Sequence, residues 1–157
     1  MEALAALLEA SALGQWARGS AVAYPVANVA HLLGLVLLVG GIGVVDLRLA
    51  GLWRGLPIAA LSRALTPLAL GGLVLLAASG SVMFAADAGP MVSSDIFRAK
   101  MALIAVGLLH AVLFRRLWRG RMVTWEADPP LAGRLMALGS LSIWLCVGAL
   151  GRLIAYA

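Results

Sequence analysis

Two histidines, His31 and His110, are the residues of this chain that most directly suggest chemistry, because each lies in a long apolar run. His31 belongs to the run from Val22 to Val45, which is long enough to cross a bilayer as a helix. An ionisable side chain in hydrocarbon is costly unless it is paired or binds a ligand, so it marks a candidate functional site. We therefore expect a ligand or proton-relay role for His31.

The depth of the polar side chains follows from the rise of about 1.5 Å per residue along a helix. His31 precedes Asp46 by 15 residues and Lys100 precedes Arg115 by 15, which places both about 22 Å above the same membrane edge. His110 lies about 15 Å closer to that edge than Lys100. Two axial ligands of one haem iron need similar depths, so the spacing favours His31 with Lys100 over His31 with His110.

Other residues fit around such a haem. Met101 is an alternative second axial ligand to Lys100. Arg152 returns to the level of His31, where its charge would suit a haem propionate. Asn28 precedes His31 by three residues, so the two share a helix face and Asn28 can orient the imidazole.

Each of these residues also has a purely structural interpretation. His31 can be a neutral imidazole bonded to a neighbouring helix, for instance to Ser79 or Ser81. Lys100 and Arg152 can anchor the helices at the interface by extending their charges to water. His110 lies just over one turn from Arg115 and can have a structural role or extend toward the same interface. Asn28 can simply form a hydrogen bond to another helix.

Copper is the alternative metal. Imidazole and thioether groups suit copper, and His31, Met83 and Met101 all fall near one level. The sequence lacks the Met-x-x-Met and His-x-His spacings that would support a copper site, and methionine also fills packed interfaces.

The composition places the whole chain in a membrane. Hydrophobic residues make up 63% and the mean hydropathy is +1.02, against about 45–50% apolar residues in soluble domains. We predict an all-α, single-domain bundle of four transmembrane helices spanning residues 22–46, 67–86, 97–115 and 131–156. Residues 1–20 are expected to hold a short helix in the membrane interface. Thr66 with Pro67, Ser94 with Asp95, and Asp128 are the expected start signals.

The basic residues predict the orientation. Eight lie in or beside the connections between the first and second spans and between the third and fourth spans, and four lie on the other side. The positive-inside rule then places the arginine-rich side in the cytoplasm and both termini in the periplasm of a bacterial inner membrane. The eight are Arg48, Arg54, Arg63, Arg115, Arg116, Arg119, Arg121 and Arg134. The basic residues that give the net charge of +5 flank membrane segments, so this charge is no sign of nucleic-acid binding.

Glycines within the spans permit close helix contact, either inside the bundle or with other chains. The chain is therefore expected to contact the lipid bilayer, and it could pack against a second copy of itself, a redox partner or a larger membrane complex. The single cysteine, Cys146, excludes an internal disulfide.

Two segments resemble known families. FRAKMALIAVGLLHAVLFRR and HLLGLVLLVGGIGVVDLRLAG are similar to the third and first helices of the four-helix membrane protoporphyrinogen oxidases and of the copper-resistance D family. In the oxidases a histidine and a lysine at these places are associated with haem b, and they correspond to His31 and Lys100. The chain lacks the aromatic-rich first helix of the oxidases. As a whole it resembles an uncharacterised family of small bacterial membrane proteins.

These observations favour a haem b protein with an electron-transfer or redox role, its haem lying between the first and third spans near the outer leaflet. An accessory subunit of a larger membrane complex is the first alternative, and a copper-handling protein is the second. Whether the chain has an enzymatic activity stays open.

Overall fold

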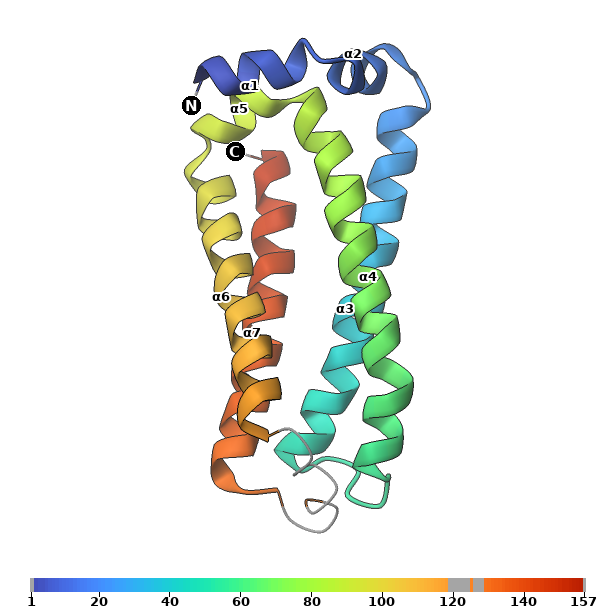
Figure 1. The fold of residues 1–157 in the computed structure, drawn as a ribbon, viewed down its shortest axis with the longest axis vertical. Helices are drawn as coiled ribbons and strands as arrows, with labels where there is room; N and C mark the ends of the chain where they lie inside the picture. The colour runs from blue at the N-terminus through green and yellow to red at the C-terminus, as the bar shows by residue number, and fades with distance from the viewer. Residues whose placement is uncertain (1, 119–124, 126–128, 157) are drawn as a thin grey trace.

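The protein consists of helices joined by turns in the parts that the computed structural model describes, which are residues 2–118, 125 and 129–156. Four helices are long and apolar enough to cross a membrane, which confirms the predicted all-α bundle. They are α3 (Ala23–Ala50), α4 (Ile58–Ala86), α6 (Asp95–Trp118) and α7 (Leu131–Leu153), which the 3-10 turn η2 (Ile154–Tyr156) extends. Both chain termini lie at one end of the elongated bundle, which we call the terminal end (Figure 1).

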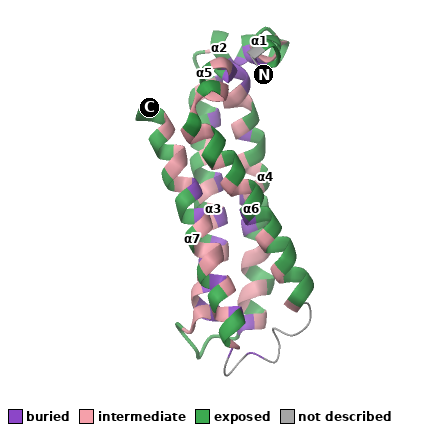
Figure 2. Ribbon diagram, turned by 90° about the vertical axis from the view of Figure 1, so that its left-hand side faces the viewer, coloured by how far each residue is buried: buried purple, intermediate pink, exposed green. Residues whose placement is uncertain are grey.

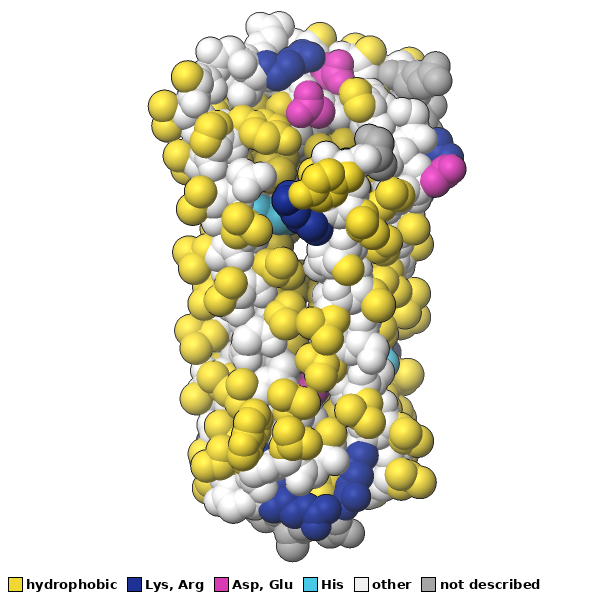
Figure 3. All heavy atoms as spheres, turned by 180° about the vertical axis from the view of Figure 1, so that it is seen from behind, with side chains coloured by type: hydrophobic (Ala, Val, Ile, Leu, Met, Phe, Trp, Pro, Cys, Tyr) yellow, Lys and Arg dark blue, Asp and Glu magenta, His cyan; other side chains and the backbone are white. Residues whose placement is uncertain are grey.

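The opposite end carries the basic side chains, and we call it the arginine-rich end. Figure 3 shows lysine and arginine side chains gathered there, below a surface that is mostly hydrophobic. The described members of this group come from the ends of the four long helices and from the connection between α3 and α4: Arg48, Arg54, Arg63, Arg115, Arg116 and Arg134. Arg119, Arg121 and Asp128 lie outside the described residues.

The tightest packing is between α3 and α4, where glycines let the two backbones meet. A Cβ atom on Gly72 would lie 2.7 Å from the carbonyl oxygen of Gly34, and one on Gly34 would lie 2.9 Å from that of Gly72. Gly41 faces Ala69 in the same way. By contrast, a Cβ on Gly40 or Gly71 would meet nothing within 4 Å, so only some of the glycines in the spans serve helix contact.

The long helices pack in the order α4, α3, α7, α6. Among these described helices, neither α4 nor α3 makes an extensive contact with α6. Helix α3 is central, whereas most of α6 faces outward (Figure 2). The only bridge from α4 to α6 among the described ring contacts is the stack of Phe84 on Phe97, whose centroids are 5.4 Å apart at the terminal end.

The N-terminal region forms two short helices instead of the single expected one. Helices α1 (Glu2–Glu9) and α2 (Ala12–Gly19) lie across the terminal end (Figure 1). The chain breaks at Ser11, whose hydroxyl caps α2 by accepting a hydrogen bond from the Gly14 amide at 3.2 Å. A third short helix, α5 (Ala88–Ser93), occupies the expected connection between the second and third spans.

The second span begins at Ile58, so the expected start at Thr66 and Pro67 was wrong. Pro67 lies inside α4. Membrane helices tolerate an internal proline when neighbouring groups satisfy the freed backbone carbonyl. Helix α3 correspondingly continues to Ala50 and ends at Gly51, whose φ of 117° suits glycine alone. Helix α6 begins where expected, with the Ser94 hydroxyl accepting a hydrogen bond from the Phe97 amide at 3.3 Å.

Candidate functional site

His31 lies in the contact between α3 and α4, in the half of the bundle nearer the terminal end. Its Nδ1 atom is 3.0 Å from the Ser79 hydroxyl oxygen on α4. Its Cε1 atom would be 3.2 Å from a Cβ on Gly80, so the absent side chain of that glycine provides the space for the ring.

The hydrogen bonds of Ser79 determine which nitrogen of His31 carries a proton. The Ser79 hydroxyl donates its single proton to the carbonyl oxygen of Leu75 at 2.6 Å, with that of Leu76 at 3.4 Å as the other acceptor. Its oxygen is thus an acceptor for His31, and Nδ1 must be the donor. The second ring nitrogen, Nε2, keeps its lone pair. A histidine that binds a metal commonly donates its other N–H to a protein acceptor in this manner.

Lys100 lies at a similar level on α6, which packs against α7. Its Nζ atom on α6 would be 3.4 Å from a Cβ on Gly151 of α7, so the lysine packs against that helix. The ammonium is within electrostatic range of the His31 imidazole, and both residues are partly buried. On one face of the molecule, a histidine lies against lysine or arginine side chains in the terminal half (Figure 3). The fold therefore brings together the two residues that the depth argument paired.

Arg152 and Asn28 have other surroundings than expected. The Arg152 guanidinium donates a hydrogen bond to the Tyr156 hydroxyl and lies 4.7 Å from the centre of that ring. Both side chains are exposed, an arrangement typical of an interfacial anchor. Asn28 is also exposed, and Ser79 takes the place that we expected Asn28 to hold beside the imidazole.

His110 lies apart from this site. Its Nε2 atom would be 3.8 Å from a Cβ on Gly139, so it occupies the contact between α6 and α7. Ten residues of α6 separate it from Lys100, which corresponds to about 15 Å along the helix. The two histidines of the chain thus belong to different helix contacts and different depths.

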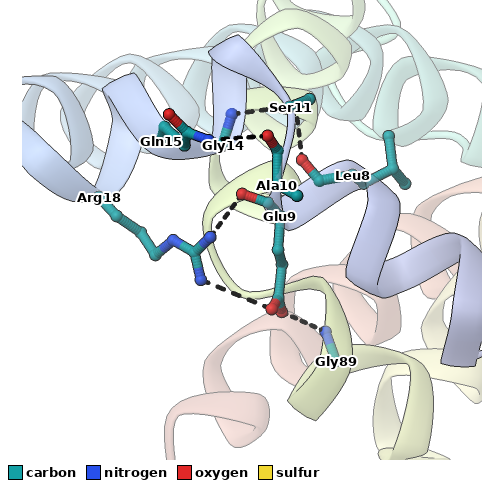
Figure 4. A network of polar contacts seen from close by, with 8 residues as sticks. All are labelled: Leu8, Glu9, Ala10, Ser11, Gly14, Gln15, Arg18 and Gly89. Atoms are coloured by element: carbon teal, nitrogen blue, oxygen red, sulfur yellow. Dashed lines mark hydrogen bonds and ion pairs between the residues drawn. The ribbon is translucent and has the colours of Figure 1, made fainter.

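The terminal end above the site is closed by α1, α2 and α5. Glu9 accepts a hydrogen bond from the Gly89 amide at 2.7 Å, and Arg18 binds both its carboxylate and its carbonyl oxygen (Figure 4). These contacts tie the three short helices together. Beneath them is an apolar pocket of about 360 Å³. It is lined by Leu4, Ala5, Leu8, Phe84, Val92, Phe97, Arg98 and Met101.

The ligating side chains near His31 determine which metal ion or cofactor the site can bind. Among the described residues, no three His, Cys, Asp or Glu side chains come together as a metal site. Met101, a proposed ligand for copper or haem, is 48% exposed and lines the apolar pocket. An axial haem ligand, by contrast, is a single side chain, and the Nε2 atom of His31 meets that requirement.

One buried ionisable residue was missed by the sequence analysis. Asp46 was treated as the edge of the first span, yet it lies inside α3 and is only 5% exposed. The apolar run does continue past it through Leu47, Leu49 and Ala50, which was the available signal.

Residues 6–157 match the model of a family described as a family of unknown function, DUF6644. The chain therefore belongs to this family, which agrees with the expected membership of an uncharacterised group. No curated protein and no solved structure matches the chain.

Proposed function

We propose, for this member of a family of unknown function, that the chain binds haem b with His31 as an axial ligand and serves in electron transfer. The observation that carries the proposal is the state of the His31 ring. Ser79 holds Nδ1 as a donor, so Nε2 is left basic and fixed in direction. A hydrogen bond of this kind raises the basicity of a ligating imidazole and sets its orientation.

The surroundings of His31 fit the group as well. Lys100 faces it from a helix that does not pack extensively on α3, and the absent side chains of Gly80 and Gly151 make room for the imidazole and the lysine. Lys100 would serve as the second axial ligand when neutral, or as a cation for a propionate when charged. Bound haem b would supply a one-electron redox couple. The resemblance of the first and third spans to the four-helix oxidases supports the same assignment.

The test is the visible spectrum of the protein purified in detergent from cells supplied with haem precursor. A reduced-minus-oxidised spectrum should show a Soret and an α band. His31→Ala should lose the bound haem, because it removes the only imidazole at this level. His110→Ala is the matched control and should keep the haem, because His110 lies in another helix contact. Haem retained in His31→Ala, or a colourless wild-type protein, contradicts the proposal.

A non-catalytic subunit of a larger membrane complex is the second candidate function. It is supported by the exposed surface of α6. Only 6% of the most apolar stretch of α6 is buried inside the bundle, against 44% of the corresponding stretch of α3. A helix so little covered by its own bundle has surface for another membrane helix. Gentle solubilisation followed by crosslinking from α6 would test it. Crosslinks to one defined partner support this role, and crosslinks to lipid alone contradict it.

A further inference from the structure

Asp46 is a carboxyl group buried at membrane depth near the arginine-rich end of α3. It lies four residues before the last residue of the helix, or about 6 Å inside its end. Its neighbours in the chain, Val45 and Leu49, belong to a buried apolar cluster with Ile58 and Ala137. Asp46 itself is 5% exposed. A charged carboxylate in such surroundings is costly unless a cation or several hydrogen bonds compensate for it.

The compensation around Asp46 is small. The Ser140 side chain of α7 lies beside its carboxyl group. The Oδ2 atom has no hydrogen-bond partner, and no ion pair includes Asp46, within the part of the chain that the structure describes.

The nearby charged groups contact other atoms. Arg48 on the same helix donates to the carbonyl oxygens of Leu56 and Arg54, and Arg134 on α7 donates to that of Pro129. Arg63 on α4 is exposed and forms no ion pair with Asp46, and His110 contacts α7 at Gly139, next to Ser140.

Two ligands would remove the charge problem, namely a proton or a metal cation. Hard metal cations bind six or more oxygen atoms, or keep much of their water. The surroundings of Asp46 offer the Ser140 hydroxyl and otherwise an apolar cluster. A proton needs no such shell, because it neutralises the carboxylate through one bond.

We infer that Asp46 is a proton-binding site within the membrane and carries its proton at neutral pH. The site is separate from His31, which lies 15 residues earlier on α3, or about 22 Å away. Between the two levels lies a second apolar cluster formed by Leu38, Ala69, Trp144 and Val147. The described residues thus provide no continuous polar path between the sites, and this inference does not depend on haem binding.

Infrared spectroscopy of the full-length protein in detergent at neutral pH tests the inference. A protonated carboxyl has a carbonyl stretching band that an ionised carboxylate lacks. The wild type should show this band, and Asp46→Asn should lose it. Asp95→Asn is the matched control and should keep it, because the Asp95 side chain is 93% exposed and paired with Arg98. Labelling all aspartates with carbon-13 should shift the band, which identifies an aspartate even if a variant fails to fold.

Three results would overturn the inference. The first is a wild-type spectrum without the band at neutral pH. The second is a band that survives Asp46→Asn or does not shift with labelled aspartate. The third is loss of the band on adding sodium ions, which would make Asp46 a metal-cation site. A band unchanged by sodium supports proton binding.

Discussion

At the scale of single residues, His31 and Lys100 are held in different ways. His31 is fixed by a hydrogen bond to Ser79, whereas Lys100 packs against Gly151 and has no ion pair among the described residues. An amine can bind iron only without its proton, so burial of Lys100 is what makes a ligand role feasible. The role of Lys100 is therefore separable from that of His31 by substitution.

Substitutions of Lys100 should distinguish a ligand from a counter-ion. If Lys100 binds the iron, both Lys100→Ala and Lys100→Arg should convert a low-spin haem spectrum to a high-spin one, because guanidinium stays charged and cannot bind iron. We expect this result, with the haem still held by His31. A low-spin spectrum that persists in Lys100→Arg would instead show that the position supplies only a positive charge.

At the scale of elements, the contact between α3 and α4 holds His31 beside Ser79. Its stability rests on the absence of side chains at a few positions, since a Cβ at Gly72 would meet backbone atoms of α3 at 2.7 Å. Backbone atoms cannot rotate away as a flexible side chain can. The two helices would have to separate, which would also stretch the hydrogen bond between His31 and Ser79.

Neighbouring glycines of α4 provide a matched test of this contact. Gly72→Ala should lower the free energy of unfolding by about 1–3 kcal/mol, as overpacking does. Gly71→Ala should leave it unchanged or raise it by up to about 1 kcal/mol, because a Cβ there meets nothing within 4 Å and alanine favours helix. Unfolding in mixed detergent, followed by circular dichroism, measures both. Equal effects of the two substitutions would contradict the packing account.

At the scale of the whole molecule, the two ends of the bundle differ in charge. The described basic side chains of the arginine-rich end come from all four long helices, whereas Glu9 and Arg18 neutralise each other at the terminal end. This asymmetry is what the positive-inside rule acts on. From it we predict that the arginine-rich end faces the cytoplasm.

Reporter fusions at the C-terminus test this orientation. A periplasm-dependent reporter should be active there, and a cytoplasm-dependent reporter should be inactive. A fusion in the connection between α3 and α4, after Arg54, should give the opposite pattern and serves as the internal control. Activity of the C-terminal fusion only in the cytoplasm would reverse the assignment and place His31 nearer the inner leaflet.

The sequence by itself was sufficient for the number of spans, the coincidence of both termini at one end and the common depth of His31 and Lys100. These properties depend on the length of apolar runs and on the constant rise of a helix, which neighbouring helices do not change. It failed at the start of α4, because Arg63 and Pro67 resemble a boundary although the helix passes through both.

Only the tertiary structure decided which neighbour each polar side chain meets. The sequence offered Asn28, Ser79 and Ser81 as partners of His31, and the structure selects Ser79. Helix rotation and packing order, which depth does not determine, turn Asn28 outward and leave the Ser81 hydroxyl on the carbonyl oxygen of Ala77. The same applies to Asp46, whose burial results from the contact of α3 with α7 and Ser140. Hydropathy specifies how deep a residue lies, whereas the lateral contacts of the four helices specify what lies beside it.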